Sequence, residues 1–370
     1  MELQINKPRF AKNPHEDKIF RAITAEVSLF MANTTKSNAP IMIVKALLYV
    51  GLFIIGYAGI ITAETTSTLF ISYAVTGISL VLLGLNFAHD CAHGALLKSK
   101  TANNAVYESL FTLVGINGYL WKKRHTHSHH NYPNTEGYDV DIELGSIVHL
   151  SVAESPKNHH SVQHIYAPLL YGIYTLYWVF YKDFVLFFKK HHANLTFKKH
   201  STKEYVKLFG GKLLYLTYIF IIPLLVTPFT VGQITLAFLL FHFAASWLLL
   251  FTFLITHHVE NTQYFSEHEK VLTSSSWLMH QVQSSNDFHA CNTVANFVFG
   301  GFNCHVAHHL FPNVSHVHYP EISRIIYRHL YSNGITPNKT TFLGGVLSHI
   351  KLLKKLGRQH NATSISYVKI

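Results

Sequence analysis

The sequence predicts an all-α integral membrane protein with four transmembrane helices arranged as two hairpins. Three observations support this prediction: four long apolar segments, stretches without basic residues around them, and three histidine clusters close by. A helix needs about 20 apolar residues to cross a hydrocarbon core about 30 Å thick. The 370 residues could form two soluble domains, but without internal repeats or a low-complexity linker we expect one domain over residues 1–370.

The four apolar segments cover residues 41–62, 68–88, 213–230 and 233–256. They are nearly continuous runs of aliphatic, aromatic and small residues. Pro223 and Pro228 interrupt the third segment, and membrane helices tolerate proline because neighbouring groups can satisfy the freed backbone carbonyl. None of the four segments contains Asp or Glu, and Lys45 is their only basic residue.

The distribution of basic residues orients the predicted hairpins. No Lys or Arg occurs from Ala46 to Leu97 or from Leu213 to Glu269. Basic residues gather instead in the N-terminal segment, in residues 98–212 and from Lys270 onward. The positive-inside rule therefore places both termini and the long central loop in the cytoplasm. Residues 63–67 and 228–232 become short external turns, and every histidine cluster lies on the cytoplasmic side.

The remaining segments predict helices that lie at the membrane surface. Ile19, Ile23, Val27 and Phe30 recur at helical spacing, which predicts an amphipathic helix on the membrane before the first span. Residues 104–120 and 163–181 are rich in Gly or aromatic residues and fit interface helices better than further spans. Residues 342–356 combine aliphatic residues with three lysines and predict another basic surface helix.

Charge and cysteine content exclude several classes of protein. The net charge of +11 with neutral histidine fits attraction to anionic lipid headgroups, and no nucleic-acid-binding motif is present. The three cysteines have no CxxC spacing, which indicates a reducing compartment without a disulfide framework or an iron–sulfur cluster. We read Cys91 and Cys304, beside the histidine clusters, as small buried thiols and not as ligands.

Three histidine clusters carry the chemistry: HDCAH at residues 89–93, HTHSHH at 125–130 and HVAHH at 305–309. Residues three or four apart share a helix face, so the side chains within each cluster can converge. Three such clusters in one chain predict a transition-metal site for more than one ion, whereas a single HxxxH would more simply be solvated surface. The pairs that we expect to share a face are His89 with His93, His125 with His129, and His305 with His308 and His309. His127 does not share the helix face of His125 and His129, so we do not expect it to join the site.

A ninth candidate ligand follows from the predicted spans. The second span ends directly before His89 and the fourth directly before His257, so these two residues emerge at the same depth. We therefore expect His257 to join the site, with Asn286 or His289 as weaker options. His242 lies inside the fourth span, and we expect it to be a packed, hydrogen-bonded histidine in the protein interior.

Together the motifs resemble those of the membrane fatty acid desaturases, and of the bacterial acyl-lipid and linoleoyl-CoA-type branch in particular. The resemblance rests on HDCAH at the end of a span, WKKRHTHSHHNYPN followed by Asp139-Val140-Asp141-Ile142, and GGFNCHVAHHLFPN. It runs from about Asn86 to about Ser323. It implies a cytosolic helical cap with a di-iron site, in a multi-pass protein of the bacterial inner membrane. The implied iron ligands are His89, His93, His125, His129, His130, His257, His305, His308 and His309.

The resemblance also implies the reaction. Such an oxidoreductase uses O₂, reduced to water, to insert a double bond into a long acyl chain carried by CoA or by a lipid. Front-end members usually have Gln where this chain has His305, which places front-end regiochemistry in doubt. The N-terminal segment lacks the HPGG of a fused cytochrome b5 domain, so electrons would come from a separate ferredoxin or cytochrome b5.

Carboxylates near the clusters are candidates for a supporting role. Metal-bound histidines usually donate their second ring N–H to a carboxylate or carbonyl. Asp90, Asp139, Asp141 and Glu260 are close enough in sequence to accept it. Asp139 and Asp141 could equally belong to a solvated loop.

Two alternative functions remain at this point. The same oxidant could return oxygen to carbon, which would make the chain a fatty acyl or alkane hydroxylase or an epoxidase of the same superfamily. A metal-ion transporter is a different class, but transporters place ionisable residues at mid-membrane depth, and these spans contain no carboxylate.

Overall fold

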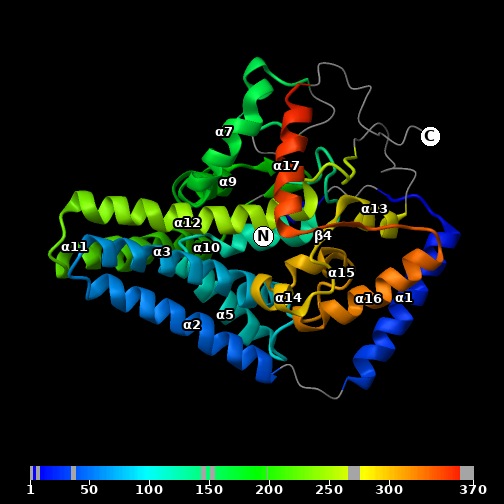
Figure 1. Cartoon of the computed structure of the whole chain (residues 1–370), viewed down its shortest axis with the longest axis horizontal. Coiled ribbons are helices and arrows are strands. Elements are labelled where there is room, and N and C mark those ends of the chain that lie inside the picture. Colours follow the sequence, from blue (N-terminus) through cyan, green and yellow to red (C-terminus); the bar gives the residue numbers. More distant parts are fainter. Residues whose placement is uncertain are drawn as a thin grey trace.

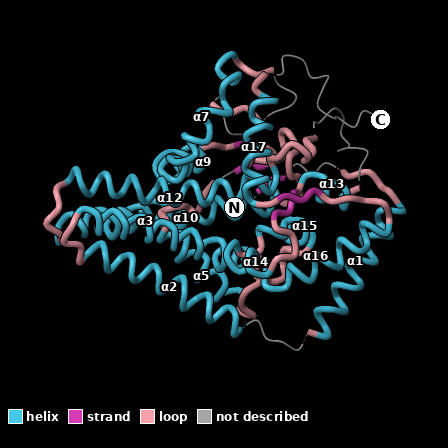
Figure 2. Tube along the Cα trace, viewed as in Figure 1, coloured by secondary structure: helices cyan, strands magenta, loops and turns pink. Residues whose placement is uncertain are grey.

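The computed structural model describes residues 3–5, 9–34, 39–142, 147–150, 155–197, 199–265 and 276–358. Four long apolar helices lie side by side at one end of the molecule, and shorter elements gather at the other (Figures 1 and 2). The long helices are α2 (Ala39–Ile61), α3 with its continuation (Thr66–Ala92), α10 with α11 (Thr202–Val226) and α12 (Val231–His257). Each is long and apolar enough to cross a membrane.

The four helices confirm the four apolar segments, with two shifted boundaries. The third helix begins at Thr202, eleven residues before the predicted start, because Lys203, Glu204 and Lys207 lower its hydropathy without disturbing the helix. It ends at Val226, and Thr227 is extended with ψ of 158°, as expected for the residue before Pro228. The second helix continues past residue 88 through a π-helical turn, Gly84–Ala88, into α4 (His89–Ala92).

Side-chain caps fix the helix starts at the far end of the bundle, where α11 and α12 meet in Figure 1. Thr65 Oγ1 accepts a hydrogen bond from Thr68 N at the start of α3. Thr230 and Gln233 form a reciprocal capping box at the start of α12. Gln233 Nε2 also donates to Thr66 Oγ1 at 3.0 Å, which ties the two short connections together.

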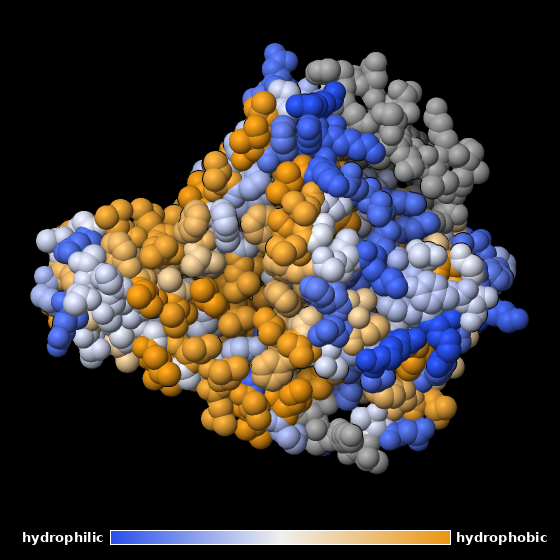
Figure 3. Space-filling view, in the orientation of Figure 1, coloured by the Kyte–Doolittle hydropathy of each residue, from blue (hydrophilic) through white to orange (hydrophobic). Residues whose placement is uncertain are grey.

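Helix α3 lies between α2 and α12 and packs closely against both. A Cβ at Gly56 of α2 would come within 2.6 Å of Thr76 Oγ1, and a Cβ at Gly77 of α3 would come within 2.6 Å of the Phe241 carbonyl. Glycine therefore permits the helix approach here, as small residues do in membrane bundles. Hydrophobic side chains cover the surface of the long helices, whereas the opposite end of the molecule is largely hydrophilic (Figure 3).

The shorter helices surround the end at which α3 and α12 finish. They are α1 (Pro14–Asn33), α5 (Lys100–Leu113), α6 (Gly118–Arg124), α7 (Gln163–Leu170), α8 (Tyr174–Tyr177), α9 (Asp183–Phe188), α13 (Trp277–Ser284), α14 (Thr293–Phe299), α15 (His305–Leu310), α16 (Tyr319–Ser332) and α17 (Phe342–Leu356). Among the described residues, six shorter turns precede or continue these helices: 3₁₀ turns at Asn158–Val162, Tyr171–Ile173, Phe302–Cys304 and His316–His318, and π-helical turns at His125–His129 and Trp178–Lys182.

The expectation of an all-α fold needs one correction, because five short strands form two small sheets within the part of the chain that the structure describes. Strands β1 (Leu3–Ile5), β3 (Leu195–Phe197) and β2 (His191–His192) make an antiparallel sheet in that order. Strands β4 (Asn286–Phe288) and β5 (Asn338–Thr340) pair in parallel, Asn286 opposite Asn338. None exceeds three residues, which is too short for an alternating pattern to be visible in the sequence.

The N-terminal amphipathic helix is present, but its apolar face is covered by protein. Ile19, Ile23 and Val27 of α1 are buried against α13, α15 and α16, and not turned toward a membrane. Figure 1 shows α1 lying beside α16. The apolar face that the sequence assigned to the membrane therefore packs against protein, because amphipathicity does not say whether lipid or protein covers it.

The two aromatic-rich segments form helices that are not among the four candidate spans. Residues 104–120 fall in α5, a turn and α6, and residues 163–181 fall in α7, α8 and the turns between them. Helix α17 has the predicted bounds and packs against α7 and α12. Gln163 Nε2 joins α7 to α17 by donating to the Leu353 carbonyl at 2.9 Å.

Candidate metal centre

Four histidines from three different segments meet in a first tetrad at the end of α3. Their candidate ligand nitrogens all lie within 4.8 Å of one another. His89 Nε2 lies 3.3 Å from His125 Nε2, and the rings of His89 and His308 are 4.4 Å apart between centroids. Helix α3 carries His89 and His93 to this point, α6 leads into His125, and α15 supplies His308. The first tetrad consists of His89, His93, His125 and His308.

A second tetrad lies beside the first. It consists of His129, His257, His305 and His309, whose candidate ligand nitrogens also lie within 4.8 Å of one another. His257 is at its centre: His257 Nε2 is 2.7 Å from His305 Nε2 and 3.1 Å from His309 Nε2. All four side chains are buried. The structure thus brings His257, from the end of α12, together with residues of the second and third clusters.

His130 lies between the two tetrads. Its Nε2 is 3.0 Å from His125 Nε2. Its ring centroid is 4.5 Å from those of both His308 and His309, one from each tetrad. All nine histidines that the sequence singled out therefore converge in one buried cluster.

The second histidine cluster contributes to both tetrads because its backbone is π-helical. The turn His125–His129 follows α6, and His130 N donates to the His125 carbonyl five residues back at 3.0 Å. A π-helical turn is wider than an α-helical one. Spacing alone predicted that His125 and His129 would serve together. They lie side by side, with ring centroids 5.6 Å apart, but belong to different tetrads.

Burial favours the neutral form of six of the nine imidazoles. Burial lowers the pKa of His93 to about 4. Burial and the neighbouring histidines hold the pKa values of His125, His130, His305, His308 and His309 well below 6.5. Neutral imidazole keeps a free nitrogen lone pair, the form that binds metal.

The nitrogens that face one another fit metal ions. His93 Nε2 and His308 Nε2 are buried without a hydrogen-bond partner among the described residues. The second ring nitrogens, Nδ1, of His125, His130 and His305 are also buried without a partner there. Where Nε2 faces Nε2, as for His257 and His305, two lone pairs would repel unless one ring donates its proton. An unsatisfied buried polar atom costs about 1–3 kcal/mol, and a cation bound between the rings would remove that cost. The donor set, all imidazole nitrogen, suits a first-row transition metal.

Hydrogen bonds orient the rings by their second nitrogens, as is common for metal-binding histidines. His257 Nδ1 lies 2.9 Å from the Ser284 carbonyl, and His309 Nδ1 lies 2.8 Å from Gln281 Oε1. His308 Nδ1 lies 3.3 Å from the Tyr319 hydroxyl. Each interaction leaves the Nε2 atom pointing into the cluster. Sequence reasoning missed Gln281, Ser284 and Tyr319, because none stands beside a histidine motif.

Asp139 and Asp141 are both at the site. Asp139 is buried, and both of its oxygens lie 3.2 Å from His129 Nδ1. Burial lowers the pKa of His129, but the charge and hydrogen bond of Asp139 outweigh it and leave that pKa raised. Asp141 accepts from Arg124 Nη2 at 2.9 Å and stands 3.7 Å from His129 Nδ1. These carboxylates lie in the structured centre and not in a solvated loop.

The other two predicted carboxylates lie elsewhere. Asp90 follows His89, but its carboxylate contacts His316 Nδ1 at 2.9 Å and accepts from Ser315 Oγ. Consecutive helix residues point in directions about 100° apart, which takes Asp90 away from the cluster. Glu260 is exposed beyond the end of α12, so the structure does not bring its side chain into the buried site.

The weaker ligand options are also apart from the tetrads. Asn286 donates to the Ile255 carbonyl and to Thr340 Oγ1, which joins α12 to the β4–β5 sheet. His289 is exposed, and its Nε2 accepts from Phe342 N. The thiols of Cys91 and Cys304 are buried and belong to neither tetrad.

A buried carboxylate that the sequence did not single out holds the third histidine cluster. Asp287 of β4 accepts from Val306 N at 2.9 Å, in the first turn of α15, and from the Tyr327 hydroxyl. Burial raises the pKa of Asp287 to about 6. Asp287 thus acts as a cap supplied from outside the short helix that carries His305, His308 and His309.

Comparison with known proteins identifies the chain. The family model described as fatty acid desaturase matches residues 65–341, about three quarters of the sequence, and the match includes all nine histidines. The chain belongs to the fatty acid desaturase family.

Several desaturases of assigned function are similar to it over most of its length. The acyl-lipid (8-3)-desaturase of Physcomitrium patens is 29% identical over 86% of this chain and 67% of its own length. The sn-1 linoleoyl-lipid 6-desaturase of Synechocystis sp. is 26% identical over 91% of this chain and 95% of its own. Acyl-lipid (8-3)-desaturase B of Dictyostelium discoideum is 28% identical over 84% and 69%.

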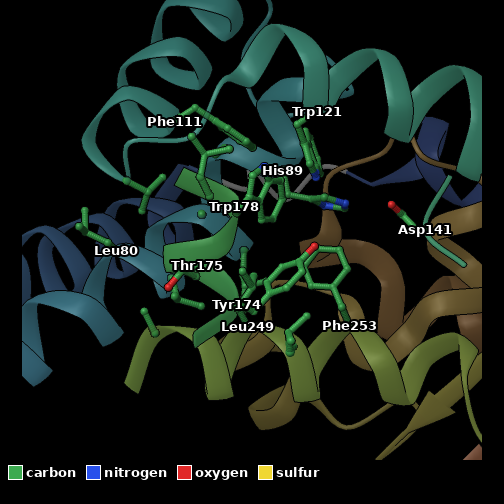
Figure 4. A pocket seen from close by; sticks show the side chains of 18 of the residues that line it. Leu80, His89, Phe111, Trp121, Asp141, Tyr174, Thr175, Trp178, Leu249 and Phe253 are labelled. Carbon is green, nitrogen blue, oxygen red and sulfur yellow. The ribbon is translucent and has the colours of Figure 1, made fainter. Parts of the chain in front are cut away.

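This desaturase has an apolar cavity beside the histidine cluster. His89, His129 and His257 line it together with aromatic and aliphatic residues of α3, α5 and α12. In Figure 4, Leu80 and Thr175 lie toward one end and Asp141 toward the other, with His89 between them. The tetrads therefore border the middle of the cavity.

Polar groups gather at the Asp141 end. Arg124 and Lys182 line the cavity there, and Lys182 Nζ donates to the Tyr174 hydroxyl at 2.9 Å. Arg124 Nε is buried without a partner among the described residues. Burial lowers the pKa of Lys182 to about 7. The cavity thus has one polar end and one predominantly apolar end.

Proposed function

We propose that the chain catalyses O₂-dependent desaturation of a long fatty acyl chain at a di-iron centre. The observation that carries this proposal is the position of the two histidine tetrads along the wall of an apolar cavity. The similar proteins are named for acyl-lipid or linoleoyl-lipid substrates, which favours a lipid-linked acyl chain here.

Nine histidines would hold the two iron ions. The first tetrad would hold one ion and the second tetrad the other, and His130 could reach either. Bound iron would supply the oxidising power that removal of hydrogen from an unactivated methylene requires. Imidazole nitrogen suits Fe(II), and a neutral ligand set leaves the positive charge of the ions uncompensated except near Asp139 and Asp141.

The protein side chains bind the substrate and keep water away. Apolar residues of α3, α5 and α12 would bury the acyl chain, at about 25 cal/mol for each Å² of apolar surface removed from water. Trp121 and Phe302 pack beside His125 and His89, respectively, on the cavity wall. Arg124 and Lys182 are placed to accept the polar head of the substrate at the other end.

Electrons would come from a donor of the ferredoxin or cytochrome b5 type. The net charge of +11 fits an acidic electron donor as well as anionic lipid headgroups. We further propose that residues 1–370 form one domain in a bacterial inner membrane. Its four spans would make two hairpins, and a cytosolic helical cap would contain the metal centre.

Expression in a membrane host, followed by fatty-acid methyl-ester profiling, tests the reaction. We expect products that have lost two hydrogens, at one position in the chain. Products that gained one oxygen would show a hydroxylase or epoxidase instead. A His308→Ala variant is the matched inactive control, because His308 faces the first tetrad.

Metal analysis of the purified protein tests the centre itself. We expect two iron atoms per chain. One zinc atom and no iron would contradict the di-iron proposal. Full activity in the His308→Ala variant would show that the third cluster does not bind metal.

A further inference from the structure

The apolar end of the cavity extends along α12 and α3. On α12 the lining residues run from His257 back to Phe241, a separation of sixteen residues that corresponds to about 24 Å. On α3 they run from His89 back to Leu80. The cavity therefore continues from the metal centre deep between the two membrane-spanning helices.

Small residues keep this part of the cavity open. Gly84, Ala88 and Ala245 all line it. A Cβ added at Gly84 would meet no atom within 4 Å, so this residue faces empty space. Gly84 lies on α3 between Leu80 and His89, about halfway from the metal centre to the deep end.

A hydrogen-bonded polar cluster lines the deep end of the cavity in an otherwise apolar region. We name Thr175, Tyr215, His242 and Ser246 the floor cluster. Thr175 Oγ1 lies 2.8 Å from His242 Nδ1 and 2.7 Å from Ser246 Oγ, and Tyr215 OH lies 2.7 Å from His242 Nε2. Thr175 N also donates to Ser246 Oγ at 2.9 Å.

The floor cluster joins three elements and is backed by aromatic rings. Thr175 comes from α8, Tyr215 from α10, and His242 and Ser246 from α12. The rings of Phe238 and Phe241 lie 4.6 Å and 5.1 Å from the His242 ring between centroids. All four members are buried, and Thr175 and His242 reach the cavity wall.

Such a hydrogen-bonded wall resists deformation. Both ring nitrogens of His242 have partners, and moving the ring would leave buried polar groups unsatisfied in a region without water. A wall made of aliphatic side chains could yield by rotamer changes. This wall can yield only by breaking hydrogen bonds.

We propose that the floor cluster sets how many carbons of the acyl chain can extend beyond the metal centre. This inference rests on the proposed desaturase function and adds a determinant of chain-length specificity to it. Thr175 and His242 form the barrier that the methyl end meets, and Tyr215 and Ser246 hold that barrier in place.

Substitutions that remove the barrier should lengthen the accepted chain. His242→Ala vacates the space of the imidazole at the deep end. A single methylene in an apolar pocket is worth about 10-fold or more in discrimination. We therefore expect the ratio of product from a substrate two carbons longer to product from the usual substrate to rise about 10-fold. Tyr215→Phe keeps the ring but removes the hydroxyl that contacts His242 Nε2, so it should raise this ratio by less than His242→Ala does.

A substitution that fills the cavity should act in the opposite direction. Gly84→Leu places a side chain in the empty space halfway along and should remove activity on long chains while shorter chains remain substrates. Thr252→Val is the matched control. Thr252 is buried in the same α12, donates to the Leu248 carbonyl and does not line the cavity.

Competition assays with a mixture of acyl chains measure the effect, and iron content and size-exclusion profile verify folding. An unchanged chain-length profile in His242→Ala and Gly84→Leu proteins with wild-type iron content would overturn the inference. If His242→Ala does not fold, the Tyr215→Phe profile decides, because Gly84→Leu tests only the path of the acyl chain and not the floor cluster. Absence of any desaturation by the wild-type protein would instead overturn the proposed function.

Discussion

Adjacent histidines at the end of α12 have different surroundings. His257 Nε2 faces His305 and His309, whereas His258 Nδ1 lies 2.8 Å from the Tyr264 hydroxyl. His258 is buried on the side of α17, where its carbonyl contacts His349 Nδ1. One residue of rotation, about 100°, thus separates a candidate iron ligand from a packing residue.

We therefore predict that His257→Ala lowers iron content and eliminates desaturation, because it removes the central nitrogen of the second tetrad. His258→Ala should retain iron. Iron analysis of the two purified variants, beside methyl-ester profiles, measures the difference. Reversed effects would assign His258 as the ligand. Full iron in both variants would place the additional ligand elsewhere.

A second residue-scale prediction concerns pH. His280 is buried in α13, its Nε2 donates to the Pro133 carbonyl, and burial lowers its pKa from 6.5 to about 3. The unfolded chain then binds a proton below pH 6.5 that the folded chain does not. His280 therefore lowers stability as the pH falls from 6.5, by about 1.4 kcal/mol per pH unit.

Thermal unfolding of the wild type and of His280→Gln between pH 7 and pH 5 measures this contribution. Glutamine can still donate to the Pro133 carbonyl but does not titrate. We expect the melting temperature of the variant to fall less steeply with decreasing pH. Parallel curves for the two proteins would contradict the assignment.

At the residue scale, the sequence located the candidate ligands more completely than the groups that hydrogen-bond to them. The nine histidines stood in motifs or at a span end, and all nine converge in the structure. Gln281, Ser284 and Asp287 come from a segment without a motif, and they reach the site only because α13 and β4 fold over it. Glu260 was wrongly included because nearness in sequence does not fix the direction of a side chain.

At the scale of elements, the short helix α15 depends on groups outside itself. It spans six residues, and isolated helices of this length are unstable in water. Asp287 accepts from Val306 N in its first turn, and the Tyr327 hydroxyl donates to the same carboxylate. The third histidine cluster is thereby fixed to β4 and α16.

We predict that Asp287→Ala destabilises the protein by about 1–3 kcal/mol, since it leaves Val306 N and the Tyr327 hydroxyl unsatisfied. Because α15 carries three histidines, the variant should also lose iron on dialysis against a chelator. Asp287→Asn is the matched control, since its amide oxygen can still accept from Val306 N. Iron retention in Asp287→Ala equal to that of the wild type would contradict the role of Asp287 in holding α15.

Helix type is the element-scale feature that the sequence did not predict. Apolar periodicity located the long helices, but π-helical turns at Gly84–Ala88 and His125–His129 directly precede or carry candidate ligands. Each turn changes the angular position of the residues after it. Its presence depends on tertiary packing. Spacing at 3.6 residues per turn correctly placed His125 and His129 side by side but did not predict that they would belong to different tetrads.

At the scale of the whole molecule, the distribution of charge and hydropathy predicts orientation. Four helices can span a membrane, and the histidine cluster lies where α3 and α12 end together. The charge distribution assigns this end of the helix bundle, where the histidine cluster lies, to the cytoplasm. The C-terminal residues 359–370 lie outside the described residues, so their placement stays a prediction from charge.

Reporter fusions test this topology. We expect a fusion after Thr65, in the connection between α2 and α3, to report the external side. Fusions after Lys157 and after Ile370 should both report the cytoplasm, because basic residues concentrate there. An external Lys157 would require an additional span between residues 98 and 157 and would contradict the two-hairpin arrangement.

The sequence predicted the bundle well because membrane spans depend on composition alone. The arrangement around the metal centre was less predictable. Amphipathicity placed Ile19 and Ile23 at a surface, but contacts with α16 bury them inside the protein. Whether an apolar face meets lipid or another helix depends on packing that a single sequence does not specify.

Helix α12 carries both His257, in the candidate metal centre, and His242, at the deep end of the cavity. A rigid helix fixes the distance between these two histidines. The position at which the acyl chain would react and the proposed limit on its length are therefore set by one helix. Inserting one residue between the two histidines would turn one relative to the other by about 100° and lengthen the helix by about 1.5 Å. Relatives that accept longer or shorter chains should therefore differ by substitutions along this helix, and insertions or deletions between its two histidines should be absent.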